Sequence, residues 1–155
     1  MGESTDKHYR KPGPVTRRMA NPFLVGLMHL GISVWGSRIL EVRGRRTGEA
    51  RRTPVNLLEY EGRQYLVAPR GEAQWVRNVR ADEGRLALIL GRRRDEGTVQ
   101  ELSDADKIPV LRAYLRRWKM EVGVFFDGVS ADSKDDDLQR IAPNHPVFLL
   151  SQPAA

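Results

Sequence analysis

Short runs rich in hydrophobic residues alternate with polar connections through the middle of the chain. This pattern is typical of strands. The runs cover residues 39–42, 55–60, 64–68, 86–90 and 98–102, and polar connections containing glycine separate them. One of these connections is the charged segment 91–97. A further apolar run over residues 146–150 predicts a terminal strand. Short strands joined by polar turns favour an antiparallel barrel or sandwich.

Apolar residues recur every three or four positions in two other segments, and this spacing predicts helices. One short helix is expected over residues 73–81, and a longer amphipathic helix follows an acidic start at residues 103–106. Ser133 is expected to cap a short acidic helix that ends near Ile141, after an irregular segment over 120–130. The longer helix has the periodic apolar positions Ile108, Leu111, Leu115 and Trp118.

The first residues differ from the rest in composition. The composition predicts a flexible basic arm over residues 1–14. A single domain is expected over residues 15–155. Asn21 and Pro22 are typical of a helix start, and apolar residues follow between Phe23 and Leu30. This segment either packs on the sheet or makes a peripheral contact with a membrane or a lipophilic substrate. Polar residues and glycines between positions 19 and 37 argue against a transmembrane helix.

Composition narrows the function classes. The 155 residues are 40% hydrophobic and 30% charged, which is typical of a soluble globular domain. The absence of cysteine excludes disulfides, thiolate metal sites and a cysteine nucleophile. No secretory signal opens the chain, so we expect a cytoplasmic protein, with membrane association as the alternative.

Arginine dominates the basic residues, with 21 arginines and 5 lysines in a chain of net charge +6. Between Arg38 and Pro54, six arginines against two glutamates give a local charge of +4. Gly44 and Gly48 allow backbone conformations that let amides and guanidinium groups converge on one anion. The segment is therefore either a cradle for a phosphate or polycarboxylate or an ordinary solvated basic hairpin.

A second candidate feature is the strand–turn–helix junction over residues 68–81. Free amides at such a junction can bind anions or carbonyl groups. Trp75 and Asn78 lie three positions apart and share a helix face. The alternative is a tryptophan that fills the core and an asparagine that caps a turn.

The sequence contains no clear motif for a metal site, a nucleotide-binding loop, a catalytic nucleophile or a nucleic-acid interface. The three histidines lie far apart without metal-ligand spacing, so no metal is expected. The chain has no phosphate-binding loop, dinucleotide fingerprint or nucleophile elbow. The sequence pI of about 10.1 and the run Arg92–Arg93–Arg94 would suit nucleic acid. No helix-turn-helix or base-stacking motif accompanies them, and we expect no nucleic-acid partner.

Three segments in this order, GRRTGEARRTPVN, YLVAPRGEAQWVRNVRA and a late HPVF, resemble the deazaflavin-dependent nitroreductase family. The likeness covers roughly residues 39–150. It implies an α+β fold, a split β-barrel related to flavin-mononucleotide-binding barrels, flanked by helices. It also implies an actinobacterial oxidoreductase that uses coenzyme F-420, an 8-hydroxy-5-deazaflavin, to reduce a quinone, a nitroaromatic or an activated alkene.

The resemblance also implies which residues hold the cofactor. The arginines would bind its phosphate and acidic tail, residues at the start of the second strand would touch it, and the junction would line its ring. Arg70 stands where the family often has lysine, and the loop between Gly71 and Trp75 is shorter than in some relatives. The implied set is Arg45, Arg46, Thr47, Arg51, Arg52, Thr53, Pro54, Val67, Ala68, Pro69, Arg70, Trp75 and Asn78.

The reaction would also need a group that protonates the product or stabilises developing charge. Tyr114 is the candidate, and the alternative is that it belongs to the core face of its helix together with Leu111, Leu115 and Trp118. The partners implied are a small-molecule hydride acceptor and a second copy of the chain, because related barrels often form homodimers. A non-catalytic barrel that binds a cofactor or a lipid is the alternative function.

Overall fold

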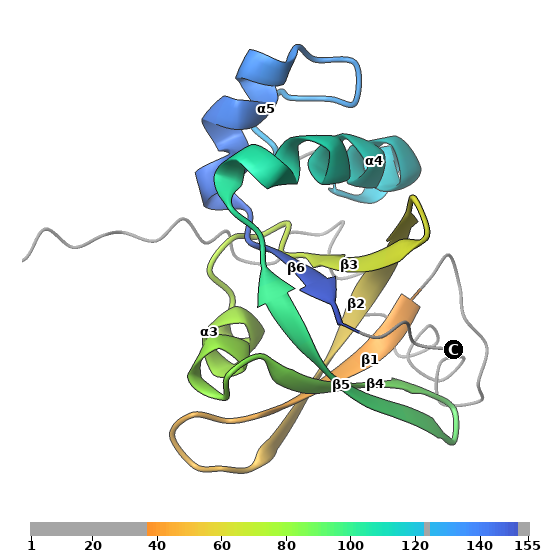
Figure 1. Cartoon of the computed structure of the whole chain (residues 1–155), viewed down its shortest axis with the longest axis vertical. Coiled ribbons are helices and arrows are strands. Elements are labelled where there is room, and N and C mark those ends of the chain that lie inside the picture. Colours follow the sequence, from red (N-terminus) through yellow and green to blue (C-terminus); the bar gives the residue numbers. More distant parts are fainter. Residues whose placement is uncertain (1–36, 123–124, 152–155) are drawn as a thin grey trace, which may run out of the picture.

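The computed structural model describes residues 37–122 and 125–151, which form a closed barrel of six antiparallel strands flanked by helices (Figure 1). The expected arm over 1–14 and the helix between Phe23 and Leu30 lie outside the described residues. Neighbouring strands follow the order β1-β2-β3-β6-β5-β4. The strands are β1 (Ser37–Arg43), β2 (Ala50–Tyr60), β3 (Arg63–Val67), β4 (Arg85–Leu90), β5 (Arg93–Glu101) and β6 (Val147–Leu150).

All six predicted strands are present, but β2 and β5 both begin five residues earlier than predicted. β2 begins at Ala50 because Arg43 and Ala50 already pair across the strands, so residues 51–54 are strand and not connection. β5 begins at Arg93, directly after a turn at Gly91 and Arg92, and not at residue 98. Both missed segments are rich in charged residues, and the hydrophobic pattern therefore hid them. Their hydrogen-bonded partners in the barrel make them strands.

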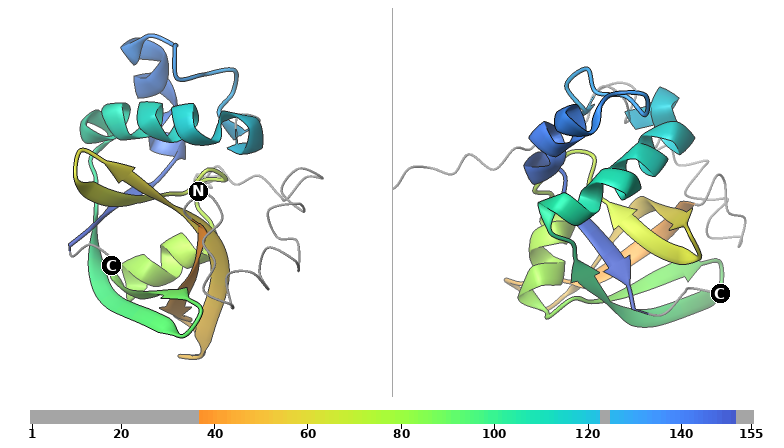
Figure 2. Two further views of the ribbon diagram at one scale, coloured as in Figure 1. Left: turned by 90° about the vertical axis from the view of Figure 1, so that its right-hand side faces the viewer. Right: turned by 45° about the horizontal axis from the view of Figure 1, so that its top comes forward.

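Helices cover one side of the barrel, as Figure 2 shows from two directions. The predicted long helix is α4 (Asp104–Val122), and the predicted acidic helix is α5 (Asp135–Ile141), followed by the short helix η2 (Ala142–Asn144). Lys134 occupies the N-cap position of α5, and the Ser133 hydroxyl instead accepts the Ser130 N–H at 2.9 Å. The helices bury a core of Val110, Leu111, Leu115, Phe125, Phe126, Leu138 and Ile141 against Leu58, Tyr65, Val67 and Val147 of the strands.

The barrel interior forms a second core. Every strand contributes to it, because alternate residues of a strand point to one face. The helix α3 (Gln74–Ala81) adds Val76 and Val79, which are both fully buried, and so covers one end of the barrel. The strand contributions are Leu40, Val42, Leu57, Leu66, Leu86, Leu88, Val99 and Phe148.

Candidate functional site

The connection between β1 and β2 is a compact turn, and we call residues 44–49 the arginine turn. The Gly44 N–H donates to the Glu49 carbonyl and the Gly48 N–H to the Gly44 carbonyl, both at 2.8 Å. Gly48 has φ +73°, and a Cβ on Gly44 would lie 3.2 Å from the Glu49 carbonyl oxygen. Gly48 therefore has the left-handed conformation that the sequence predicted for a glycine, whereas Gly44 has no positive φ and a side chain there would meet only a tight contact. The turn presents Arg45, Arg46 and Thr47 on exposed positions.

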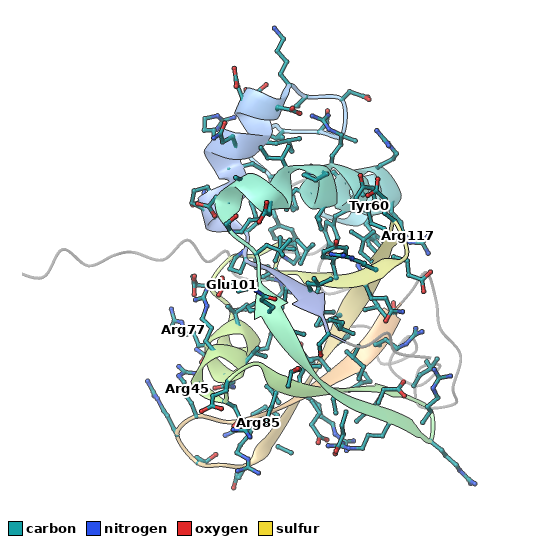
Figure 3. The ribbon with its side chains drawn as sticks, in the orientation of Figure 1. Arg45, Tyr60, Arg77, Arg85, Glu101 and Arg117 are labelled. Atoms are coloured by element: carbon teal, nitrogen blue, oxygen red, sulfur yellow. The ribbon has the colours of Figure 1, made fainter. Side chains whose placement is uncertain are left out.

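Arg45 ties the arginine turn to α3, as the labelled side chain in Figure 3 shows. Its backbone N–H and its Nη1 both donate to Oδ1 of Asn78, at 3.1 and 2.8 Å. Nη1 also donates to Oε1 of Gln74 at 2.9 Å. Asn78 is only 5% exposed. Two neutral carboxamides thus hold Arg45, so its positive charge is not cancelled.

The start of α3 has two features that favour an anion, although Glu72, which pairs with Arg80, lies directly before it. Ala73 occupies the N-cap position without a side-chain hydrogen bond, and the first turn has no acidic residue. The first N–H groups of a helix lack internal partners and carry partial positive charge. Arg70 lies in the half-exposed loop directly before this helix and forms no ion pair with another described residue.

Arg77 adds a cation that sequence reasoning missed. It follows Gln74 by three positions, so the two side chains are neighbours on α3. Its Nε is buried without a hydrogen-bond partner, and no described carboxylate pairs with it. Figure 3 shows Arg77 and Arg45 projecting on the same side of the molecule. The signal in the sequence was this helical spacing within the segment QWVRN, where only Trp75 and Asn78 were singled out.

The prediction that Arg45, Arg46, Arg51 and Arg52 converge on one anion is wrong in part. Arg51 lies opposite Val42 in the β1–β2 register, and Arg52 lies opposite Glu41. Successive residues of a strand point to opposite faces, so the two arginines diverge. Thr53 lies on the face of Arg51, and Pro54 on the face of Arg52.

Arg52 belongs instead to an ion-pair group on the barrel wall, which we call the Glu41 cluster (Glu41, Arg52 and Arg94). Glu41 accepts from Arg52 Nε at 2.8 Å and pairs with Arg94 Nη2 at 2.6 Å. The hydrogen bond from Arg94, more than that from Arg52, holds the pKa of Glu41 below its usual range. The same contact raises the pKa of Arg94. These arginines therefore already have an anion.

Arg80 fastens α3 to the rest of the barrel. Its guanidinium donates to both carboxylate oxygens of Glu101 at 2.8 and 2.6 Å, and also to Glu72. The bond to Glu101 is the main reason that the pKa of Arg80 is raised. Two carboxylates balance this arginine, in contrast to Arg77 on the same helix and to Arg45 in the arginine turn.

The junction before α3 only partly matches its predicted role. Val67 and Ala68 are 5% and 1% exposed, and the Ala68 N–H already donates to the Pro146 carbonyl at 2.9 Å. Pro69 and Arg70 are half-exposed. Trp75 is half-buried and packs its ring on Phe148, with centroids 5.6 Å apart. The accessible part of the predicted junction is therefore Pro69, Arg70 and the outer edge of Trp75.

Tyr114 lies away from the arginine turn. It is 2% exposed and its ring packs on Trp118 and Phe126, with centroids 5.0 and 6.2 Å apart. This environment matches the alternative in which Tyr114 is part of the helix core. A cavity of about 200 Å³ also lies on the α4 side, lined by Tyr60, Ile108, Pro109, Arg112, Ala113, Arg116 and Asp135.

The described residues contain neither a membrane-spanning helix nor a cluster of metal-ligating side chains. Within 37–122 and 125–151, no helix combines the length and hydrophobicity that crossing a membrane requires. Over the same ranges, no three His, Asp or Glu side chains gather in a way that could hold a metal ion.

Comparison with known proteins gives a family and a fold. A family model described as F-420H(2)-dependent quinone reductase matches residues 24–130. A solved F-420-H2 dependent reductase, FDR-A, aligns over 75% of this chain and 94% of its own with TM-score 0.52 and 17% identity. A protein solved as a domain-swapped dimer aligns over 87% and 96%, with TM-score 0.55 and 17% identity.

A third solved structure, a protein of unknown function from Agrobacterium tumefaciens, has TM-score 0.55 and 16% identity over 93% of this chain and 60% of its own. Among curated proteins, none matches the chain. The predicted α+β split-barrel fold is confirmed by the closed antiparallel barrel and by these structural matches.

Proposed function

The chain belongs to the F-420H(2)-dependent quinone reductase family, and on that premise we propose that it transfers hydride from the reduced deazaflavin coenzyme to a lipophilic acceptor. Quinones, nitroaromatics and activated alkenes are the acceptor classes. The site proposed for the coenzyme is the region where the arginine turn meets the start of α3.

One observation carries this proposal: the cations around the start of α3 lack acidic partners among the described residues. Arg45 is held by neutral carboxamides, and Arg46, Arg70 and Arg77 form no ion pair there. Arg77 is half-buried and its Nε has no acceptor, which is costly, and an anion in the site would relieve that cost. The uncapped N-terminus of α3 adds partial positive charge at the same place. These groups fit a ligand with a phosphate and carboxylates.

The residues of the chain then have distinct roles. The anionic part of the coenzyme is bound by Arg45, Arg46, Arg70 and Arg77. The edge of the same region is formed by Thr47, Arg51 and Thr53. Pro69 and the exposed edge of Trp75 offer an apolar surface for the ring. When bound, the coenzyme supplies the hydride, so the protein requires no nucleophile of its own. Its contribution is to position donor and acceptor at reacting distance and to exclude water.

Three other assignments are part of the proposal. Arg52 and Pro54 lie on the opposite face of β2, so we assign them a minor part in coenzyme binding. We propose a homodimer, by analogy with the relative solved as a domain-swapped dimer. The cytoplasmic location and the membrane contact between Phe23 and Leu30 stay predictions.

The test is a pair of measurements on purified protein. Titration with oxidised deazaflavin coenzyme, followed by fluorescence, should give saturable binding, and riboflavin phosphate should bind more weakly. Steady-state oxidation of the reduced coenzyme should then depend on added menadione. Binding without turnover of any acceptor class would favour the alternative of a cofactor-binding barrel. Tight riboflavin phosphate binding without deazaflavin binding would defeat the proposal.

A further inference from the structure

Asn78 is placed to act on the ligand through Arg45. The residue is only 5% exposed, so little of it can touch a bound molecule. A single oxygen, Oδ1, accepts both the backbone N–H and the guanidinium of Arg45, at 3.1 and 2.8 Å. Those two bonds fix the Arg45 side chain relative to its own backbone. They also fix the arginine turn relative to α3.

Gln74 completes this arrangement one helical turn earlier. Residues four apart lie on one helix face, so Gln74 and Asn78 present their carboxamides to the same guanidinium. Oε1 of Gln74 accepts from Nη1 at 2.9 Å. Both groups are neutral acceptors. The guanidinium is therefore oriented on one side, while its net charge remains available to a ligand.

The same helix shows what a carboxylate does in this position. Arg80 lies two residues after Asn78 and is held by Glu101 and Glu72. Charge-assisted bonds of this kind are stronger than bonds to a neutral carbonyl. They also cancel the field of the guanidinium. Carboxylates at positions 74 and 78 would have held Arg45 more firmly but would have repelled an anionic ligand.

We propose that Asn78 and Gln74 are positioning residues that orient Arg45 without neutralising it, so that it can bind an anionic group of the ligand. The inference rests on the proposed function only for the identity of that ligand. It differs from the role that the family resemblance implies for Asn78, which is direct contact with the coenzyme.

The experiment separates two effects of Asn78: its effect on the orientation of Arg45 and its effect on the net charge around Arg45. Asn78→Asp keeps an oxygen for both bonds and adds a negative charge, whereas Asn78→Ala removes the acceptor and leaves the charge of Arg45. Gln139→Glu makes the same chemical change at an exposed position of α5 and serves as the control. Gln74→Glu and Gln74→Ala repeat the pair at an exposed position, where folding is not at risk.

Hydrogen exchange at the Arg45 backbone amide in the ligand-free protein measures orientation. Asn78→Ala should speed this exchange about tenfold, the equivalent of one lost hydrogen bond. Asn78→Asp should leave it unchanged or slower. Unchanged exchange in folded Asn78→Ala would overturn the positioning role.

Affinity for the oxidised coenzyme at low and high ionic strength measures charge. Asn78→Asp should weaken binding about tenfold at low salt and reduce the salt dependence, because screening acts on a smaller net charge. Asn78→Ala should weaken binding but keep the salt dependence of the wild type. Affinity and salt dependence equal to the wild type in Asn78→Asp and Gln74→Glu would overturn the proposal.

The two hypotheses can fail separately. If the wild type binds no deazaflavin, the proposed function fails, and inorganic pyrophosphate then replaces the coenzyme as the anionic probe. The positioning role would stand if pyrophosphate shifts the Arg45 resonances in the wild type but not in Asn78→Asp. It would fail if both proteins respond alike.

Discussion

The arginine turn connects β1 and β2, and the Glu41 cluster spans β1, β2 and β5. Both regions use arginine, but they differ in what balances its charge. In the Glu41 cluster, one carboxylate accepts from Arg52 and pairs with Arg94. In the arginine turn, the Arg45 guanidinium donates hydrogen bonds to two carboxamides and forms no ion pair with a described carboxylate. An arginine with a carboxylate partner stabilises the fold, whereas one held by neutral groups keeps its charge for a ligand. The count of arginines in a segment therefore does not identify an anion site, but the kind of partner does.

The largest effect should come from Arg45→Ala. Hydrogen bonds to charged groups contribute about 1.5–3 kcal/mol, which corresponds to an affinity loss of about ten- to a hundredfold. Fluorescence titration with the oxidised coenzyme measures the loss, which should be greater at low salt. Arg52→Ala is the matched variant from the Glu41 cluster, and its affinity should change by less than about threefold. Equal losses in the two variants would remove the distinction between the two regions.

Glu41→Gln should mainly change stability and its pH dependence. The pKa of Glu41 is lowered in the folded protein, so its ionised form stabilises the fold above the unfolded value and this contribution is lost as pH falls. Both partners are partly exposed, so we expect a loss of about 1 kcal/mol at neutral pH. Urea unfolding between pH 7 and about pH 3, spanning the ordinary glutamate pKa, checks this.

In that pH series, the difference in unfolding free energy between Glu41→Gln and the wild type should become smaller as the pH falls. Glu96→Gln is the control, because Glu96 is a more exposed partner of the same Arg94, with 74% of its side chain accessible. A constant difference across the pH range would contradict the role assigned to the charge of Glu41.

Arg77→Met should have a smaller effect than Glu41→Gln. It should stabilise the fold but weaken coenzyme binding. Removing a half-buried guanidinium without a partner should raise the unfolding free energy by about 0.5–1 kcal/mol. Loss of the same cation should weaken coenzyme binding about threefold. Thermal unfolding and titration on one preparation measure both. A destabilised variant with unchanged binding would show that Arg77 serves the fold, as Arg80 does.

Tyr114→Phe should change the reaction least. Because Tyr114 is 2% exposed within the helix core, the hydride-transfer rate to menadione should stay within about twofold of the wild type. Stopped-flow oxidation of the reduced coenzyme gives that rate. A loss of about a hundredfold, with binding and melting temperature unchanged, would restore Tyr114 as the proton donor.

Much of the fold could be predicted because its signals are local. Short apolar runs located β1, β3, β4 and β6, and three-to-four spacing located α3 and α4. The first halves of β2 and β5 were missed because their residues are charged, and neighbouring strands decide their structure. For the site, the sequence located the arginine turn, the junction before α3 and the motif pair Trp75 and Asn78.

The sequence by itself determined that many cations and two glycines occupy one short connection next to an apolar barrel. Only the tertiary structure decided which cations remain available. Strand register turned Arg51 and Arg52 to opposite faces and brought Glu41 against Arg52 and Arg94. Contact between residues 33 positions apart joined Arg45 to Asn78. Charge is a property of a residue, but its neutralisation depends on a partner, and partners distant in the chain meet only in the folded protein.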